Sequence, residues 1–516
     1  MQDTAQPVRI EAPVIADEIL SDFSAALAAH AAATPDKPAL IEGGTTLSWS
    51  EFGDALARVA GKLQAEGVRP GTQVASLAEN SVEHVVLYCA VLRAGGCMVP
   101  LPYSAADAAI TKMLSDSGAA LLFASAPQMD RAATLGGPAP IAVETIENWA
   151  KDAAPIAPVP GAPDALFNII YSSGTTGTPK GIQHDNRFRA RQMQRMDRLG
   201  WHSGARALMS TPLYSNTTLV AALAALVQGG TLAIMPKFDA EAFLKTSEAL
   251  KITHAMLVPV QYMRLMAHPE FDRYDLSSYE RKYSTSAHLP AKVAADVMAR
   301  WPGNLIEIYG MTEGGITCVL DCAAWPDKLH TVGRPPEGSE ALVIDEAGNV
   351  LPQGAFGELV GRAPSMMTAY RNLPDKTAEM IWTDPEGGHW IRTGDMGRID
   401  EDGFIELMDR RKDMIISGGF NIYAADLEAE LVKHPDVAEA AVIAIPSDQW
   451  GETPLALVVP RAGANADPEA IRAAANENLG KTQRIAKVEL RGSLPRSEIG
   501  KVLKRELRAP YWEGRD

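Results

Sequence analysis

Apolar and polar positions alternate along the chain in stretches that predict helices and strands in turn. Ser21–Ala33 and Trp49–Glu66 carry apolar residues at helical spacing, whereas Gln73–Leu77 and Cys97–Leu101 are short apolar runs typical of buried strands. Repeated alternation of helices and strands predicts an α/β fold in which mostly parallel sheets are layered with helices.

Two stretches indicate boundaries within the chain. Ala153–Pro163 is rich in Ala and Pro and predicts a surface connection before the apolar strand Ala165–Ile170. Near Asp409–Lys412 a hairpin-like strand ends and a separate run of strands and helices begins, long enough for a small α+β domain. The elements expected in this run are strand Asp413–Ser417, helix Ala424–His434, strands Ala441–Ile445 and Leu455–Val459, and helix Asp467–Leu479. We therefore predict a large domain over residues 1–411 and a small one over residues 412–516.

Composition and charge narrow the class of protein. The chain is 46% hydrophobic and 22% charged, which is ordinary for a globular protein. A net charge of -16 disfavours a broad nucleic-acid surface, so an anionic ligand would need a local cradle of amides and a few cations. We expect no stable membrane anchor, because the longest apolar stretches, such as Leu219–Val227, are typical of buried elements. The absence of a signal pattern and only four cysteines predict a cytoplasmic protein with reduced thiols.

The clearest motif follows the strand Ala165–Ile170 and reads Tyr171-Ser-Ser-Gly-Thr-Thr-Gly-Thr-Pro-Lys-Gly181. Its glycines let successive N–H groups point into one concavity, and its hydroxyls and Lys180 add donors for an anion. The alternative is a flexible hydroxyl-rich turn. We predict phosphate binding, although the loop is not of the Walker A type, because Pro179 precedes Lys180 and Gly181 follows it.

Three further segments carry candidate chemistry. In Ile308-Tyr-Gly-Met-Thr-Glu-Gly314, Thr312 and Glu313 offer the oxygen ligands that Mg²⁺ prefers, and Tyr309 can stack on a purine. Taken alone, the same tyrosine and glutamate would be a core aromatic and a solvated acid.

In Trp390-Ile-Arg-Thr-Gly-Asp395, the carboxylate of Asp395 can accept both ribose hydroxyls, with Arg410 close in sequence, although a lone Asp after Gly is most often a turn residue. In Leu494-Pro-Arg-Ser-Glu-Ile-Gly-Lys501, the lysine is either one more surface charge on a basic tail or a catalytic cation.

These four segments, in this order, resemble the adenylate-forming superfamily of acyl-CoA synthetases, aryl-CoA ligases, luciferases and peptide-synthetase adenylation domains. The runs Arg410–Asn421 and Asp448–Glu452 are most similar to bacterial aryl- and fatty-acyl-CoA ligases. The resemblance implies a large N-terminal domain with the phosphate loop and acid pocket, and a small mobile C-terminal domain that swings between two poses.

The resemblance also implies a role for each matching residue. It implies that the β- and γ-phosphates are bound by Thr175, Thr176, Gly177 and Lys180, and that the α-phosphate and magnesium are bound by Thr312 and Glu313. Tyr309 would stack on the purine, and Asp395 and Arg410 would bind the ribose or the phosphates. Lys412 would be the hinge, and Lys501 would bridge the carboxylate and the α-phosphate. Gly418 and Gly419 would line the passage for CoA, and Trp450 would pack on CoA or in the core. The expected walls of the acid pocket are Trp201, Tyr214, Ser215, Val258, His288, Ile308 and Gly310.

The sequence departs from the family pattern at three places. Ser215 stands where many relatives have a His after an aromatic, and His288 stands where small residues commonly line the acyl pocket. Thr482–Ile485 lacks the aromatic–Lys–x–Pro pattern that often precedes the catalytic lysine, which leaves its contact with CoA open.

The function implied is an ATP-dependent ligase that joins an aryl or medium- or long-chain carboxylic acid to CoA through acyl-AMP, with ATP, Mg²⁺ and CoA as its small molecules. The chain ends fifteen residues after Lys501, so we expect free CoA to be the thiol, with a separate carrier protein as the alternative. A kinase-like P-loop machine is disfavoured by the loop sequence, and a non-catalytic nucleotide-binding regulator by the presence of Glu313, Asp395 and Lys501 together. Homodimers are common in such families, so a homodimer is an open expectation.

Overall fold

The computed structural model describes residues 9–10, 12–13, 22–172, 179–410, 415–417, 420–422, 424–447, 451–479, 484–496 and 502–513. The chain divides into two compact units, residues 1–341 with 361–391 and residues 342–360 with 392–516. The domain boundary expected between residues 411 and 412 stays a prediction, because residues 411–414 lie outside the described ranges.

The first unit contains an eight-stranded sheet in the order β14-β13-β12-β11-β9-β10-β1-β2. Neighbours from β13 through β1 are parallel, and only the edge strands β14 and β2 are antiparallel. Its strands are β1 (Pro38–Glu42), β2 (Thr45–Ser48), β9 (Arg206–Met209), β10 (Thr231–Ile234), β11 (His254–Leu257), β12 (Arg281–Ser284), β13 (Asn304–Gly310) and β14 (Thr317–Asp321). The carboxyl ends of β9, β11, β12 and β13 therefore meet at one edge, where ligands of open α/β sheets usually bind.

A second, seven-stranded sheet has the order β17-β8-β7-β4-β3-β5-β6. The pairs from β7 to β6 are parallel, whereas β8 is antiparallel to both β7 and β17. Its strands are β3 (Gln73–Leu77), β4 (Cys97–Pro100), β5 (Leu121–Ala124), β6 (Pro140–Ala142), β7 (Leu166–Ser172), β8 (Lys180–Asp185) and β17 (Ala369–Tyr370). The mostly parallel α/β fold expected from the alternating pattern is confirmed.

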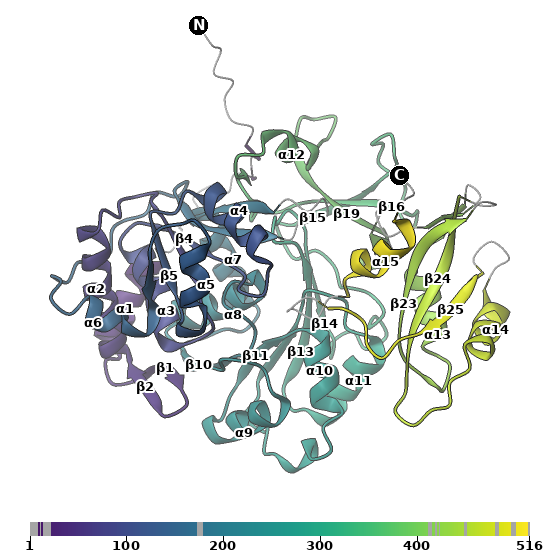
Figure 1. The fold of residues 1–516 in the computed structure, drawn as a ribbon, viewed down its shortest axis with the longest axis horizontal. Helices are drawn as coiled ribbons and strands as arrows, with labels where there is room; N and C mark the ends of the chain where they lie inside the picture. The colour runs from purple at the N-terminus through teal and green to yellow at the C-terminus, as the bar shows by residue number, and fades with distance from the viewer. Residues whose placement is uncertain are drawn as a thin grey trace, which may run out of the picture. The chain divides into compact units, whose positions relative to one another are not determined.

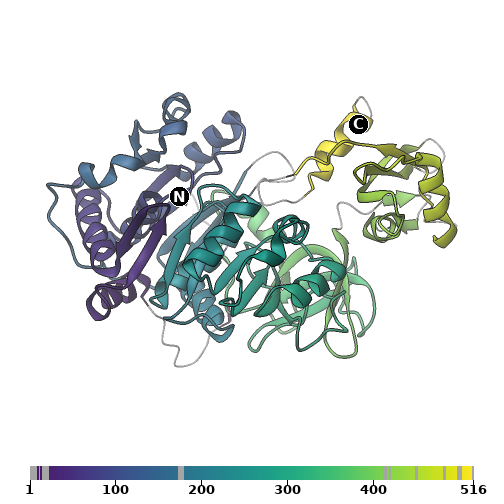
Figure 2. The ribbon, with the colours of Figure 1, turned by 90° about the horizontal axis from the view of Figure 1, so that it is seen from below.

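Helices cover these sheets, and in Figure 2 the purple-to-blue helices group around strands of the same colours. Buried side chains from α1, α2, α3, α7 and α8 join residues of both sheets in the main hydrophobic core. The helices of this unit are α1 (Phe23–Ala33), α2 (Trp49–Ala65), α3 (Val82–Arg93), α4 (Asp107–Ser117), α5 (Met129–Thr134), α6 (Ile146–Trp149), α7 (Asn186–Arg198), α8 (Asn216–Val227), α9 (Ala240–Leu250), α10 (Pro259–Met266), α11 (Ala291–Arg300) and α12 (Pro374–Glu379).

Local sequence explains where α2 begins. The Ser48 side chain accepts from the Glu51 N–H while the Glu51 carboxylate accepts from the Ser48 N–H, a reciprocal capping box. The helix predicted over Trp49–Glu66 is confirmed to within one residue. The apolar stretch Leu219–Val227 lies in α8 and contributes to the core. Among the described helices, none combines the length and apolarity needed to cross a bilayer.

A third sheet has the order β15-β16-β19-β18, with β20 also paired to β19. Its strands are β15 (Glu340–Ile344), β16 (Gly357–Arg362), β18 (Ile381–Thr383), β19 (His389–Ile399) and β20 (Ile405–Arg410). The predicted hairpin is confirmed, because β19 and β20 pair antiparallel across the turn at Asp400–Gly403.

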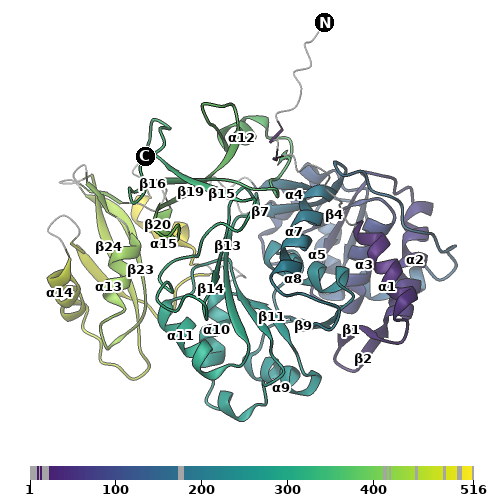
Figure 3. The same ribbon diagram turned by 180° about the vertical axis from the view of Figure 1, so that it is seen from behind.

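The end of the second unit is the expected small α+β assembly. Its sheet has the order β22-β21-β24-β23, with β25 paired to β24, and Figures 1 and 3 show α14 beside these strands. The elements are β21 (Ile415–Ser417), β22 (Phe420–Ile422), α13 (Ala424–Leu431), β23 (Val437–Ser447), β24 (Gly451–Pro460), α14 (Pro468–Asn478), β25 (Lys487–Leu490) and α15 (Lys504–Trp512). Helix α13 ends at Leu431, three residues before the predicted His434. In a helix that continued, the ring of Pro435 would clash with the carbonyl of Leu431, four residues earlier.

Candidate active site

Lys180 and Glu313, far apart in sequence, contact the same aromatic residue, Lys180 at the face of the ring and Glu313 at the hydroxyl. The Lys180 Nζ lies 4.9 Å from the ring centroid of Tyr370, and the Tyr370 hydroxyl donates to Glu313 Oε1 at 2.7 Å. The backbone of the same loop is fixed as well, since the Met367 N–H donates to the Glu313 carbonyl at 2.8 Å. Two predicted site residues are therefore joined by a tyrosine that the sequence analysis missed.

Strand β17 positions Tyr370. Tyr370 faces Ile182 in the antiparallel pair β17–β8, and the Arg371 N–H donates to the Gly181 carbonyl at 2.7 Å. Burial, together with the negative charge of Glu313 and the hydrogen bond to it, raises the pKa of Tyr370 far above the ordinary tyrosine value. The phenol therefore remains a protonated donor at neutral pH. Its only sequence signal is the run Ala369–Asn372 just before a helix, which is too short to be specific.

The phosphate loop connects two adjacent strand ends. Ser172 and Lys180 are direct partners in the antiparallel pair β7–β8, as are Tyr171 and Gly181. A Cβ on Gly181 would lie 3.0 Å from the Tyr171 ring, a tight contact that glycine avoids. The predicted phosphate ligands Thr175, Thr176 and Gly177 lie outside the described residues.

A buried network holds the backbone at Thr312. His184 Nε2 lies 2.7 Å from the Thr312 carbonyl oxygen, and Arg189 donates to His184 Nδ1 at 3.0 Å. Because a guanidinium cannot accept, Nδ1 is the accepting nitrogen and Nε2–H donates to Thr312. Burial and the charge of Arg189 hold the pKa of His184 well below its usual value, so the imidazole is neutral.

Gly314 lets the chain turn directly after Glu313. Its φ of 75° lies in the left-handed region, and a Cβ there would come within 2.2 Å of the Ser365 carbonyl oxygen. The Gly315 N–H donates to the same carbonyl at 2.9 Å. Backbone contacts thus fix the turn that carries Thr312 and Glu313.

Most of the expected acid-pocket walls follow the carboxyl ends of the parallel strands. Tyr214 and Ser215 follow β9, Val258 follows β11, and Ile308 and Gly310 close β13. Tyr214 packs edge-on against Tyr103 with ring centroids 5.3 Å apart, and Ser215 and Val258 are buried. The sheet therefore gathers these residues at the edge that also carries Thr312.

His288 and Trp201, two other expected walls of the acid pocket, make contacts elsewhere. His288 Nδ1 is 3.0 Å from Glu307 Oε1, and Glu307 points to the face of β13 opposite Ile308. The hydrogen bond and negative charge of Glu307 outweigh burial and raise the pKa of His288. Trp201 is 1% exposed and stacks on Tyr283 in the core. Their predicted places in the pocket wall gain no support from these contacts.

The ribose candidates are neighbours in the second unit. Asp395 and Arg410 are direct partners in the antiparallel pair β19–β20. Asp395 is 8% exposed, and its N–H donates to Thr393 Oγ1 at 2.9 Å. Predicted site residues outside the described ranges are Lys412, Gly418, Gly419, Trp450 and Lys501.

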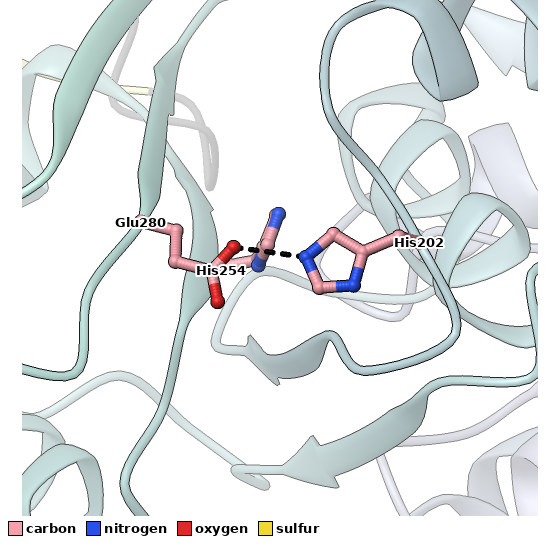
Figure 4. Close-up of side chains that lie close together, drawn as sticks. All are labelled: His202, His254 and Glu280. Atoms are coloured by element: carbon pink, nitrogen blue, oxygen red, sulfur yellow. Dashed lines mark hydrogen bonds and ion pairs between the residues drawn. The ribbon is translucent and has the colours of Figure 1, made fainter.

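Among the described residues, one cluster could hold a metal ion: His202, His254 and Glu280, whose ligand atoms lie within 4.8 Å of one another (Figure 4). His254 uses both ring nitrogens already, Nε2 with the Gly200 carbonyl at 3.0 Å and Nδ1 with Thr253 Oγ1 at 2.7 Å. His202 Nε2 lies 2.8 Å from Glu280 Oε2. The cluster sits where β9, β11 and β12 begin, at the sheet edge opposite Thr312, and its hydrogen bonds account for it without a metal.

Comparisons with known proteins agree with the geometry. The AMP-binding enzyme model matches residues 27–371, and the AMP-binding enzyme C-terminal domain model matches residues 426–501. A feruloyl-CoA synthase from Amycolatopsis sp is 34% identical over 93% of this chain and 96% of its own length. The fatty acid–[acyl-carrier-protein] ligase ScoC of Streptomyces coeruleorubidus is 31% identical over 94% and 95%. ATP-bound MatB from Rhodopseudomonas palustris superposes with a TM-score of 0.86 and 29% identity, covering 96% of this chain and 99% of that one.

Proposed function

The chain belongs to the AMP-binding enzyme family, and on that premise we propose that it is an ATP-dependent carboxylic acid:CoA ligase. It would form acyl-AMP from the acid and ATP with release of pyrophosphate, and then acyl-CoA with release of AMP. The observation that carries the proposal is the group Lys180–Tyr370–Glu313, which sets a cation and a carboxylate around one aromatic ring beside the expected phosphate loop.

The chemistry requires such a group because the reacting carboxylate and the triphosphate are both anions. Catalysis therefore depends on positioning and on neutralising charge. Among the described residues, Lys180 contacts an aromatic face and is paired with no carboxylate. Its charge is thus available to the phosphates, while Thr175, Thr176 and Gly177 would supply loop donors.

Glu313 suits a magnesium ion bound with ATP. Tyr370 occupies Oε1, and Oε2 accepts no hydrogen bond in the described structure, which leaves an oxygen donor of the kind Mg²⁺ prefers. Bound there, Mg²⁺ would neutralise phosphate charge. The His184 network would hold Thr312 beside the α-phosphate, and Tyr309 would stack on the purine.

Residues of the second unit would act in the same reaction. Asp395 would accept the ribose hydroxyls with Arg410 nearby, and Lys501 would bridge the carboxylate and the α-phosphate during adenylation. Rotation about Lys412 would then withdraw Lys501 and bring Gly418, Gly419 and Trp450 toward CoA. We further propose a cytoplasmic enzyme, where ATP and CoA are available, that acts on aryl or medium- to long-chain acids and assembles as a homodimer.

Transfer to a carrier protein is the second candidate, because the ligase ScoC, 31% identical, is named for an acyl-carrier protein. A screen of aliphatic, benzoic and cinnamic acids with ATP and Mg²⁺ would separate the two. Parallel reactions would contain CoA, a phosphopantetheinylated carrier protein, or neither, with pyrophosphate, AMP and thioester measured. We expect AMP and acyl-CoA with CoA. Thioester on the carrier alone would favour the second candidate, and ADP in place of AMP would refute both.

A further inference from the structure

Helix α7 buries charged groups beside the expected acid pocket. Arg189 is fully buried on this helix, yet every one of its recorded partners is neutral. Four of its five guanidinium N–H groups nevertheless have acceptors, namely Asn168 Oδ1, Gln192 Oε1, Asn216 Oδ1 and His184 Nδ1 at 2.6–3.0 Å. Arg191 likewise donates to the Pro364 carbonyl at 2.6 Å. These two arginines are therefore structural.

Arg195, on the same helix, is not saturated. Its one recorded hydrogen bond within the described structure runs to Thr317 Oγ1 at 3.1 Å, and its buried Nε has no partner. Burial lowers the pKa of Arg195 to about 10, with no carboxylate contributing, so the group is still a cation at neutral pH. Arg195 is half-buried, but its Nε is fully buried, and a buried donor normally has an acceptor. The spare donors of this cation therefore indicate that a ligand supplies the missing acceptor.

The position of Thr317 shows where that ligand lies. Thr317 is the direct partner of Gly310 in the antiparallel pair β13–β14, so both residues face the same side of the sheet. Ile308 shares that face, because side chains alternate along a strand. A Cβ on Gly310 would lie 3.8 Å from Thr317 Oγ1. The Arg195 guanidinium therefore borders the face of β13 that carries two expected walls of the acid pocket.

The Arg195 guanidinium lies close enough to Thr312 for one small acid to extend between them. Thr312 follows Gly310 by two residues, a span of at most about 7 Å. A small acid whose carboxylate lies at Thr312 can thus extend toward Arg195 at its other end. Gln192 lies one helical turn before Arg195, but its Oε1 already accepts from Arg189 at 2.6 Å. Met193 and Met196 are buried in the main core and offer no oxygen acceptor in their side chains.

We propose that Arg195 determines substrate specificity by binding an oxygen acceptor at the far end of the acid. The substrate class is then carboxylic acids with a second carboxylate or an aryl hydroxyl, rather than plain hydrocarbon acids. This inference rests on the proposed ligase function.

The test compares matched acid pairs, an aryl acid with and without a para hydroxyl and a linear acid with and without a second terminal carboxylate. AMP formation gives kcat/KM for the wild type, Arg195→Met and Arg195→Lys. Arg198→Met is the control, because Arg198 is exposed in the last turn of α7. We expect the wild type to favour the oxygen-bearing acid of one pair by roughly 10- to 100-fold. Arg195→Met should lose that preference through KM and keep activity on the hydrocarbon partner, Arg195→Lys should retain part of it, and Arg198→Met should match the wild type.

The pair that responds identifies the oxygen as carboxylate or hydroxyl. An unchanged preference in Arg195→Met, or a wild type that favours hydrocarbon acids, would overturn the assignment to Arg195. If Arg195→Met does not fold, Arg195→Lys is used instead, and its kcat/KM values for the two acids of a pair are compared. A ratio equal to that of the wild type, with KM unchanged for both acids, counts against the proposal. If none of the acids gives AMP, the ligase function itself is refuted.

Discussion

The Tyr370 hydroxyl donates to Glu313 Oε1 at 2.7 Å, and this bond ties the strand beside the phosphate loop to the loop that carries the expected magnesium ligand. The face of the same ring contacts Lys180. One neutral side chain thus contacts both the lysine expected to bind phosphate and the glutamate expected to bind magnesium.

Tyr370→Phe keeps the ring under Lys180 and removes the bond to Glu313. A hydrogen bond to a charged group contributes about 1.5–3 kcal/mol, so we expect kcat/KM for AMP formation to fall by roughly 10- to 100-fold. Tyr370→Leu, which also removes the aromatic face, should lower it further. Tyr274→Phe is the control, since Tyr274 follows α10 in the chain and is not one of the expected site residues. Wild-type activity in Tyr370→Phe would show that the bond is dispensable.

Glu313→Gln tests the magnesium assignment. The amide still accepts from Tyr370 but carries no charge, so the Mg²⁺ concentration for half-maximal activity should rise at least roughly tenfold. Saturating Mg²⁺ should restore part of the rate. The exposed Glu379 provides the control Glu379→Gln. An unchanged magnesium titration would remove Glu313 from the metal site.

Gly314→Ala should disrupt the turn after Glu313. The positive φ and the contact of the new Cβ with the Ser365 carbonyl together predict a loss of about 3 kcal/mol or more in stability. Gly354→Ala has a similar φ of 84° with no atom within 4 Å of the new Cβ, so it should cost only about 1–2 kcal/mol. Denaturant unfolding of the two variants measures the difference, and equal losses would exclude the steric part.

Acid should destabilise the protein through its buried histidines. Burial lowers the pKa of His84 and of His254 to about 4, and burial with Arg189 holds the pKa of His184 well below its usual value. Their unfolded forms bind protons below pH 6.5 while the folded forms do not, so stability is lost as the pH falls from 6.5 toward 4. Each histidine contributes up to about 1.4 kcal/mol per pH unit. Thermal unfolding at pH 7, 6 and 5 measures how stability depends on pH. His254→Asn should reduce the slope of stability against pH by the equivalent of one proton, and an unchanged slope would contradict the prediction.

Lys501→Ala separates the two half-reactions. If Lys501 acts only during adenylation, acyl-AMP formation should fall by roughly 100- to 1,000-fold, whereas thioester formation from supplied acyl-AMP should stay near the wild-type rate. Single-turnover measurements of each step provide the comparison. Lys504→Ala, three residues on, is the control for general loss of basic charge. Equal losses in both steps would contradict the assigned role.

Features that depend on neighbouring residues could be predicted from the amino-acid sequence alone. The capping box at Ser48 begins α2, and the run Tyr171–Gly181 marks a loop between two strands, since backbone preferences and side-chain periodicity act over a few residues. The order of the motifs was sufficient to identify the adenylate-forming family. The fold class followed from the alternation of helices and strands.

The contacts between residues far apart in the chain became visible with the folded structure. Tyr370 joins Lys180 to Glu313 because β17 pairs with β8, and His184 fixes Thr312 because a helix buries Arg189 next to it. Among the described residues, Arg195 donates to Thr317 on β14, while its buried Nε has no partner. None of these residues carries a local signal, since a tyrosine, a histidine or an arginine within a helix or strand has the same sequence context whether it is structural or functional. Strand pairing and burial set these contacts, and both depend on segments far apart in the chain.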